Sequence, residues 1–465
     1  MKRLLCMIVL LALVLSVLPG CNLFANYSLN NVSITDYTIV YDADGLDYNK
    51  RAAEYIRDEI WSRTGALLRV VTDDKSPFDH EIVVGETNRD ISAALNEDTE
   101  GFEFSIMADG AHVALEGDYF VIAAAAYYFV NTFILKGQTS AIVSTEPVVH
   151  TPITKEAENI ILLIGDGMGF NQTTLFDVYS AEEMNAYSDG ESAFYGYMFP
   201  YQGEARTDSL EGTTDSAASG TALATGFKTD NGRVGMDSRL NVVKNFVEIA
   251  AELGKSTAVM TTESLTGATP AAFTAHVASR GADISIANGQ KSLVEKYGTL
   301  ILGNYGAVYD AETVENVIEK ELRDTLKTLA KDKDGFFMMY EEAYFDKHSH
   351  SNELENTFLA GLRFNQIIGT VMEFAFYNPD TLVLITADHE TGGITKSDDG
   401  SYYYTTENHT SANVPVFAFG RDVSVFHNTA VENIQIPKTF AAMWGVELEG
   451  YMNEEYPSLL PVAQK

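Results

Sequence analysis

Four short apolar runs, separated by segments with helical spacing, dominate the last two thirds of the chain. They lie at residues 159–164, 256–261, 335–339 and 381–386. A fully apolar run of this length is typical of a strand buried on both faces of a parallel sheet. Between the runs, segments such as 243–253, which Gly254 ends, have the apolar spacing of helices. This alternation predicts an α/β fold with a doubly wound, mostly parallel sheet.

Polar residues follow these runs at the place where open α/β sheets collect ligands. That place lies outside the carboxyl ends of the strands. Asp166, Thr262, Glu341 and Asp388 come just after the four runs. The sequence therefore predicts a carboxylate-rich site along one edge of the sheet.

A smaller α/β unit is expected in front of this sheet, over residues 36–150. We expect helices and strands at the following positions: strands at 37–41, 67–71, 81–84 and 113–115, and helices at 49–64 and 119–132. The unit contains no cluster of reactive groups. Its sequence, including Glu81-Ile-Val-Val-Gly85-Glu-Thr-Asn88-Arg89, resembles accessory α/β domains at the front of some bacterial glycosidases. The resemblance implies an extracellular add-on module and gives it no activity.

The start of the chain has the pattern of a processing segment over residues 1–20. A basic Met1-Lys2-Arg3 precedes an apolar run that is too short for a stable membrane span. The run ends in Leu18-Pro19-Gly20-Cys21, which resembles the bacterial lipobox. That resemblance implies lipidation of Cys21 and an extracytoplasmic protein held on a bacterial membrane, either periplasmic or on the cell surface. Residues 21–35 would form a flexible tether. An ordinary secretory signal with a chance cysteine is the alternative.

The charge of the chain limits its partners. Its 66 acidic and 31 basic residues give a formal net charge of −35. Such a surface argues against nucleic acid or anionic lipid as a general partner. An anionic substrate would need local cations, such as metal ions and a few arginines.

Two Asp/His pairs indicate metal chemistry. Asp346 and His350 are four residues apart, so they share one face of a helix, and Asp388 and His389 are adjacent after an apolar run. Carboxylate oxygen and imidazole nitrogen both suit Zn²⁺. Three further residues in equally distinctive settings suggest two metal ions beside a serine: Asp166, Ser216 and His409.

Ser216 stands at the start of an alanine-rich stretch that favours a helix, and Asp215 can cap that start. The serine would lie near backbone N–H groups that stabilise anions at a helix N-terminus. A second capping serine on an ordinary helix is the alternative. A free serine is a poor nucleophile and needs a base or a metal ion. No Gly-x-Ser-x-Gly sequence surrounds it, which favours activation by metal.

Four blocks of sequence occur in a distinctive order. They are Ile164-Gly-Asp166-Gly-Met-Gly169, Asp215-Ser216-Ala-Ala-Ser219, Ala268-Thr269-Pro-Ala-Ala272 with Ser279-Arg280, and Thr386-Ala-Asp388-His389-Glu-Thr-Gly-Gly393. These blocks resemble the signature blocks of the alkaline phosphatases, over roughly residues 158–465. The resemblance implies that family's fold and hydrolysis of small phosphate monoesters through a phosphoserine. Family members are often homodimers.

Carried over residue by residue, the resemblance implies two zinc ions and one magnesium ion. The ligands of one zinc would be Asp346, His350 and His409. Those of the other zinc would be Asp388, His389, Asp166 and the Ser216 hydroxyl. Those of magnesium would be Asp166, Thr269 and Glu341. Oxygen-only ligands suit Mg²⁺, and mixed nitrogen and oxygen ligands suit Zn²⁺.

Two cationic residues match positions near the phosphate in the family. Arg280 matches a phosphate-clamping arginine, whose fork fits two phosphate oxygens. A surface salt bridge is its alternative. Lys347 matches a lysine that reaches the phosphate through water in some bacterial members, and its alternative is a solvated helix residue beside Asp346.

The chain also departs from the family pattern around the magnesium ligands. The family usually has Asp or His two residues before the magnesium threonine, where this chain has Gly267. Loss of that side chain is expected to weaken or alter the site. Glu342 and Ala343 replace glycines that often follow the magnesium glutamate, so Glu342 is expected to add negative charge. The segment 298–310 diverges from the usual glycine-rich loop.

Other functions remain open at this point. Phosphodiesterases of the same superfamily typically have threonine at the nucleophile position, and sulfatases need a Cys/Ser-x-Pro-x-Arg context, which Ser216 lacks. A surface lipoprotein without catalytic activity, whose front unit holds a glycan, is the alternative from another class.

Overall fold

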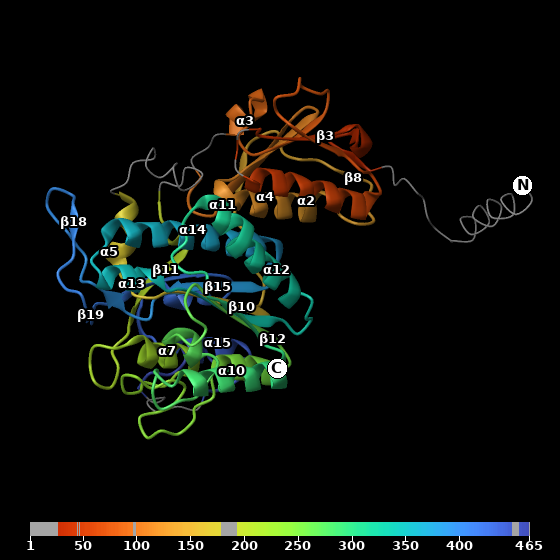
Figure 1. Cartoon of the computed structure of the whole chain (residues 1–465). Coiled ribbons are helices and arrows are strands. Elements are labelled where there is room, and N and C mark those ends of the chain that lie inside the picture. Colours follow the sequence, from red (N-terminus) through yellow and green to blue (C-terminus); the bar gives the residue numbers. More distant parts are fainter. Residues whose placement is uncertain are drawn as a thin grey trace, which may run out of the picture. The chain divides into compact units, whose positions relative to one another are not determined.

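The computed structural model describes residues 27–43, 45, 47–95, 99–177, 193–448 and 455–464. The chain divides into two compact units (Figure 1). One spans Met1–Thr99 and Glu103–Thr151, and the other spans Glu100–Phe102 and Pro152–Lys465. The predicted signal segment and Cys21 lie outside the described residues, so lipidation stays a prediction. Among the described residues, every helix is too short or too polar to span a bilayer.

The N-terminal unit is built on a six-stranded sheet in the order β4-β3-β5-β7-β6-β9. Its strands are β3 (Thr38–Tyr41), β4 (Arg69–Thr72), β5 (Glu81–Val84), β6 (Phe104–Asp109), β7 (His112–Glu116) and β9 (Val148–His150). Its helices are α2 (Asp47–Thr64), α3 (Asp90–Leu95), the 3-10 turn η2 (Tyr119–Val121) and α4 (Ile122–Phe133). The first four strands of the sheet are parallel, whereas β6 and β9 pair antiparallel. The sequence missed these two strands and α3.

The beginning of this unit corrects one prediction. Strand β1 (Ser28–Leu29) pairs with β2 (Val32–Ser33) and with β8 (Ser140–Ala141), and the turn η1 (Ile34–Asp36) follows. Tyr27 and Leu29 are buried, and the Tyr27 hydroxyl donates to the Phe133 carbonyl. The flexible tether predicted for residues 21–35 is therefore wrong from Tyr27 onward, because apolar side chains anchor that stretch.

The larger unit contains an eight-stranded sheet in the order β13-β12-β14-β10-β15-β20-β11-β21. Its strands are β10 (Asn159–Gly165), β11 (Tyr201–Arg206), β12 (Ser256–Thr261), β13 (Leu300–Gly303), β14 (Phe336–Glu342), β15 (Thr381–Thr386), β20 (Val414–Phe419) and β21 (Ala430–Glu432). The five strands from β13 to β15 are parallel, and β20 runs antiparallel to both of its neighbours. The predicted fold class is confirmed, and the runs at 256–261 and 381–386 form strands with those bounds.

Helices cover both faces of this sheet, with α12 and α14 on one face and α7, α10 and α15 on the other (Figure 1). The helices are α5 (Phe170–Thr173), α7 (Ser216–Thr225), α8 (Phe246–Glu252), α9 (Ala268–Ala272), α10 (Asp283–Tyr297), α11 (Ala311–Thr313), α12 (Lys320–Leu329), α13 (Tyr344–His350), α14 (Leu354–Tyr377) and α15 (Gln435–Met443). Three 3-10 turns are η3 (Leu175–Asp177), η4 (Tyr195–Met198) and η6 (Val423–Phe426), and a π-helical segment η5 (Val314–Glu319) lies between α11 and α12. Two small ribbons pair β16 (Glu390–Thr391) with β19 (His409–Thr410), and β17 (Thr395–Lys396) with β18 (Tyr402–Tyr403). Helix α8 starts later than the predicted 243, because Asn245 and Glu248 form a capping box there.

The register of the central strands determines where the site lies. Ile164 pairs with Glu341 on one side and with Thr386 on the other. The residues that follow β10 and β15, and the end of β14, therefore meet at the carboxyl edge of the sheet. All three strands are fully buried, so this edge rests on a rigid apolar base.

Candidate active site

Ser216, His389 and two aspartates come together at the carboxyl edge of the sheet. The Ser216 hydroxyl lies 3.2 Å from His389 Nε2. The same nitrogen lies 3.5 Å from Asp166 Oδ1 and 3.3 Å from Asp388 Oδ2. All four residues are buried. The structure thus brings the hydroxyl of residue 216 next to the ligands predicted for one metal ion.

A second cluster forms around Asp346 on α13. Its Oδ1 lies 3.2 Å from His350 Nε2 and 3.3 Å from His409 Nε2, and these two nitrogens are 3.1 Å apart. Asp346 and His350 share one helix face, as their spacing predicted. The rings of His389 and His409 stack with centroids 3.6 Å apart, so the two clusters are adjacent.

The three histidines are oriented in the same way. In each ring Nδ1 is bonded to an oxygen: Thr391 Oγ1 for His389 at 3.1 Å, the Thr214 carbonyl for His409 at 2.8 Å, and the Glu407 carbonyl for His350. Each Nδ1 therefore donates its proton to that oxygen, and Nε2 is the ring nitrogen that faces the clusters. Burial, aided by the neighbouring His409, lowers the pKa of His389 to about 3, so its ring is neutral. Neutral imidazoles held by a second oxygen are the usual form of metal-binding histidine.

The buried carboxylates of the site crowd one another. Burial raises the pKa of Asp388 to about 6, and the charge of Asp346 adds to the effect. Burial also raises the pKa of Asp166 well above its usual range, helped by the charge of Asp388. Asp166 Oδ1 and Asp388 Oδ2 have no hydrogen-bond partner among the described residues. Buried carboxylate oxygens without a hydrogen-bond partner, next to an imidazole Nε2, are suitable ligands for a cation bound between them.

The predicted magnesium ligands show the same feature. Thr269 on α9 and Glu341 on β14 are completely buried, and Thr269 Oγ1 and Glu341 Oε1 lack a hydrogen-bond partner within the described part of the chain. The other oxygen of Glu341 accepts a hydrogen bond from the Thr261 hydroxyl. Burial raises the pKa of Glu341, and the charge of Glu263 adds to the increase. An oxygen-only set of donors fits Mg²⁺.

Glycine at 167 lets the two clusters approach. Its φ of +77° lies in the left-handed region, and a Cβ there would stand 2.8 Å from the Asp346 Cα. Its N–H donates to Asp388 Oδ1 at 3.2 Å. A side chain at this position would therefore push α13 away from the strand ends.

Helix α7 places Ser216 at its first residue. Asp215 caps the helix, accepting from the Ala218 N–H at 2.9 Å, as predicted. The Ser219 hydroxyl donates to the Asp388 carbonyl at 2.5 Å, which ties the helix to the metal ligands. Arg280 Nη1 donates to Asp215 Oδ2 at 3.0 Å, and the arginine side chain remains 44% exposed. The guanidinium is thus held beside the serine and is open to solvent.

Comparison with known proteins decides the family. The family model described as alkaline phosphatase matches residues 157–306 and 312–436, more than half of the chain. The chain belongs to the alkaline phosphatase family. Alkaline phosphatase 3 of Bacillus subtilis (strain 168) is 29% identical over 347 residues, which cover 63% of this chain and 75% of that one. Alkaline phosphatase of Escherichia coli (strain K12) is 27% identical over 335 residues, covering 50% and 70%.

A solved structure gives the same result. The alkaline phosphatase from the Antarctic bacterium TAB5 is 26% identical, with a TM-score of 0.54 over 62% of this chain and 98% of that one. A histidine-to-glutamate mutant of the TAB5 enzyme is described with Mg bound in its M3 site. The protein is accordingly a metal-dependent phosphoric monoester hydrolase that acts on phosphate esters.

One departure from the alkaline phosphatase pattern is neutralised within the fold. Arg363 on α14 donates to both oxygens of Glu342, at 2.7 and 2.6 Å, and both side chains are buried. Arg363 also donates to the carbonyls of Gly306 and Val308, at 2.6 and 2.9 Å. The expectation that Glu342 adds negative charge to the site is therefore wrong. The two carbonyls that accept from Arg363, those of Gly306 and Val308, both lie in the divergent 298–310 segment.

Lys347 is paired. Its Nζ donates to Glu263 Oε2 at 2.5 Å. Burial lowers the pKa of Lys347, but the charge of Glu263 outweighs it and holds this pKa above its usual range. Lys347 is therefore charged, and Glu263 balances that charge. The Lys347 side chain is also 40% exposed, and the role predicted for it at the phosphate stays a prediction.

Several residues of the site were missed from the sequence. Thr391 and Ser219 stand inside the matched blocks, so their polar side chains beside ligands were a usable signal. Thr391 donates to Asp346 Oδ1 at 2.6 Å while it accepts from His389. Glu263 and Arg363 have no local signal, because their partners are brought close only by the fold.

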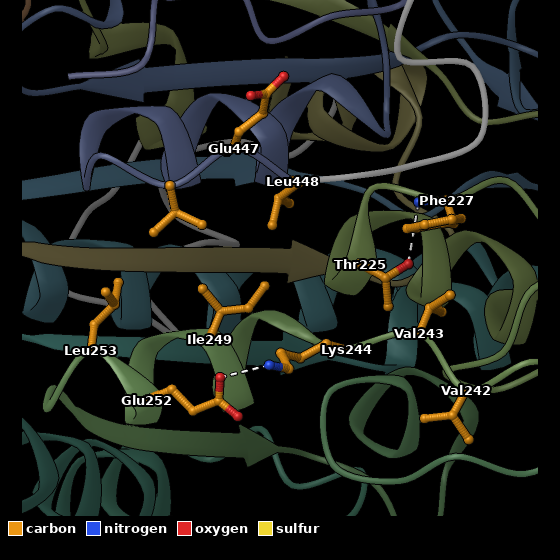
Figure 2. A pocket seen from close by; sticks show the side chains of 11 residues that line it. Thr225, Phe227, Val242, Val243, Lys244, Ile249, Glu252, Leu253, Glu447 and Leu448 are labelled. Atoms are coloured by element: carbon orange, nitrogen blue, oxygen red, sulfur yellow. Dashed lines mark hydrogen bonds and ion pairs between the residues drawn. The ribbon is translucent and has the colours of Figure 1, made fainter. Parts of the chain in front are cut away.

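A cavity at the other end of α7 does not belong to the site. It has a volume of about 570 Å³ and lies at the far end of α7, at Thr225 (Figure 2). That end is about 14 Å along the helix axis from Ser216. Figure 2 shows the ion pair between Lys244 and Glu252, 2.6 Å long, on its wall. None of the predicted catalytic or metal-binding residues lines it.

Proposed function

We propose that this alkaline phosphatase hydrolyses small phosphate monoesters through a phosphoserine on Ser216, with two zinc ions and one magnesium ion. The observation that supports it is the 3.2 Å approach of the Ser216 hydroxyl to His389, between two carboxylate–imidazole clusters. Asp346, His350 and His409 would hold one zinc, and Asp166, Asp388 and His389 the other. Asp166, Thr269 and Glu341 would hold magnesium.

Bound divalent cations would lower the pKa of a hydroxyl or of water and would neutralise oxygens that gain charge during the reaction. The chain's own residues do the positioning. The Thr391 hydroxyl and the Thr214 carbonyl hold the His389 and His409 rings with Nε2 facing the clusters. Ser219 holds the Asp388 backbone.

The reaction has two displacements at phosphorus. In the first, Ser216 Oγ loses its proton and bonds to phosphorus, the bond between phosphorus and the ester oxygen breaks, and that oxygen takes up a proton and leaves as the alcohol. In the second, a water oxygen forms a bond to phosphorus, the Ser216 Oγ–phosphorus bond breaks, and inorganic phosphate leaves. Arg280 and the first N–H groups of α7 would hold the oxygens that do not react, in both steps. Phosphodiesterases of the same superfamily typically have threonine at the nucleophile position, so a serine at 216 favours monoesters over diesters.

We also propose that the protein is lipidated at Cys21 and held outside the cytoplasm on a bacterial membrane, where it would act as a homodimer. The support for the anchor is the sequence of residues 1–21. Radiolabelled palmitate fed to expressing cells would label the wild type and would leave a Cys21→Ala variant unlabelled. Equal labelling of both would contradict the anchor.

Replacing Ser216 by alanine tests the mechanism. We expect turnover of p-nitrophenyl phosphate to fall by about 10³-fold or more, as is usual on loss of a nucleophile. Acid quenching with radioactive substrate should label the wild type and leave the variant unlabelled. Ser285→Ala, at an exposed serine of α10, is the control and should keep full turnover. Undiminished turnover by Ser216→Ala would exclude the phosphoserine, and an inactive wild type with two bound zinc ions would favour the non-catalytic alternative.

A further inference from the structure

Glycine at 267 is not required by the backbone. Gly267 has φ −54°, which any residue adopts. It stands two residues before Thr269, where alkaline phosphatases usually have Asp or His. The reason for a glycine must therefore lie in the space around it.

The Glu263 side chain fills that space. A Cβ built on Gly267 would lie 1.8 Å from Glu263 Oε1 and 2.4 Å from its Cδ. Side-chain atoms of residue 267 and the present Glu263 carboxylate therefore exclude each other. The carboxylate of Glu263 lies where a residue-267 side chain would begin, four positions away along the chain.

Glu263 is held firmly in this place. It follows β12, its N–H donates to Thr261 Oγ1 at 3.1 Å, and its carbonyl accepts from the Asn304 N–H at 2.8 Å. Its Oε2 pairs with Lys347, and its side chain is only 15% exposed. The Thr261 hydroxyl that accepts from the Glu263 N–H donates in turn to Glu341 Oε2, so a single hydroxyl group joins Glu263 to Glu341.

Three oxygen atoms near Glu263 indicate a bound cation. Thr269 Oγ1, Glu341 Oε1 and Asp166 Oδ1 are buried without a hydrogen-bond partner in the described part of the chain. Each belongs to a side chain that is at least nine-tenths buried. Three unpartnered oxygens beside a carboxylate form a site for a hard cation, which takes oxygen ligands.

We propose that Glu263 supplies the carboxylate of this magnesium site, in place of the side chain that is missing at position 267. Lys347 balances its charge and orients it. The inference rests on the proposed function, because it assumes that Asp166, Thr269 and Glu341 bind magnesium. It predicts that glycine at 267 and glutamate at 263 depend on each other.

Magnesium titration of the full-length, zinc-loaded protein by calorimetry tests the inference. We expect Glu263→Gln to weaken Mg²⁺ binding by about 10- to 100-fold, as is typical for residues that support metal ligands. Gly267→Ala should weaken it similarly, because its methyl group would displace the Glu263 carboxylate from this space while leaving that carboxylate in the chain. The double variant Glu263→Ala/Gly267→Asp should regain most of the affinity, because it returns a carboxylate to the same space. Glu252→Gln, on the exposed face of α8, is the matched control and should bind Mg²⁺ as the wild type does.

The outcomes separate this inference from the function on which it rests. Wild-type affinity in Glu263→Gln would overturn it, and so would a failure of the double variant to recover, since Glu263 would then serve only as the partner of Lys347. If Glu263→Gln does not fold, Gly267→Ala decides between the same outcomes. Zinc content and turnover of the wild type report on the proposed function independently. An active, zinc-loaded wild type that binds no magnesium would refute the inference alone.

Discussion

Replacing Arg363 by methionine should destabilise the phosphatase unit strongly. Methionine has a similar length and removes the charge. Glu342, which is completely buried, would lose two hydrogen bonds of 2.6–2.7 Å and its only opposite charge among the contacts described for it. The carbonyls of Gly306 and Val308 would each lose a donor. Removal of one partner from a buried ion pair typically costs about 3–5 kcal/mol, and we expect a loss in this range.

The two tryptophans of the chain make the measurement specific to one unit. Trp61 lies in α2, and Trp444 is buried in the larger unit, where its Nε1 donates to the Ala157 carbonyl. A Trp61→Phe background leaves Trp444 as the fluorescent reporter of that unit. Urea unfolding at fixed zinc and magnesium concentrations then gives the free energy of unfolding of the phosphatase unit with and without Arg363.

The double variant Glu342→Gln/Arg363→Met is the control. Glutamine at 342 is neutral, so removing Arg363 leaves no unpaired buried charge in the double variant. The double variant should therefore be more stable than Arg363→Met alone, and the interaction energy between the two positions should be about 2 kcal/mol. A loss of less than about 1 kcal/mol in Arg363→Met, or a double variant no more stable than that single one, would refute the reasoning. Either result would mean that Glu342 takes up a proton or finds water instead of depending on Arg363.

Two further predictions follow from the electrostatics and the geometry. Arg280→Lys should lower kcat/KM for a phosphomonoester by about 10- to 100-fold and weaken inhibition by inorganic phosphate, because lysine lacks the fork that binds two oxygens; equal inhibition constants for phosphate would contradict a clamping role. In the N-terminal unit, burial raises the pKa of Glu116 to about 7, with the charges of Glu86 and Asp118 adding to it. Because the pKa of Glu116 is higher in the folded than in the unfolded protein, the wild type loses stability as pH rises from the unfolded pKa to about 7. Glutamine does not titrate. The Glu116→Gln variant should therefore gain stability relative to the wild type between about pH 5 and pH 8, on the order of 1 kcal/mol after solvent screening. Thermal unfolding followed by Trp61 in a Trp444→Phe background measures this difference, and a difference independent of pH would exclude the effect.

The sequence predicted the centre of the large sheet because its strands are buried on both faces. The apolar runs at 159–164 and 381–386 gave their positions directly. The antiparallel side of the sheet was missed. Strand β20 contains Pro415, which argues against a central strand. In the structure Pro415 pairs only with β11, because the register of β20 with β15 covers 417–419, so its missing N–H costs the sheet no bond.

The candidate site was predictable where neighbours in sequence carry the chemistry. Asp388 with His389, and Asp346 with His350, are local pairs, and their convergence follows from strand order. The substitutes for missing family residues were not predictable. Glu263 reaches the space beside Gly267, and Arg363 reaches Glu342 from another helix. Each depends on a contact that only the folded chain makes, so the sequence showed the gap at 267 and not what fills it.

The burial of Tyr27 limits how far the N-terminal unit can stand from a bilayer. If Cys21 carries a lipid, six peptide steps separate the acyl chains from the first anchored ring, and a fully extended chain of that length reaches about 20 Å. This is shorter than the diameter of a small domain. A segment this short would keep the N-terminal unit close to the lipid headgroups. The surface charge and the orientation of that unit would then affect how substrates reach the enzyme.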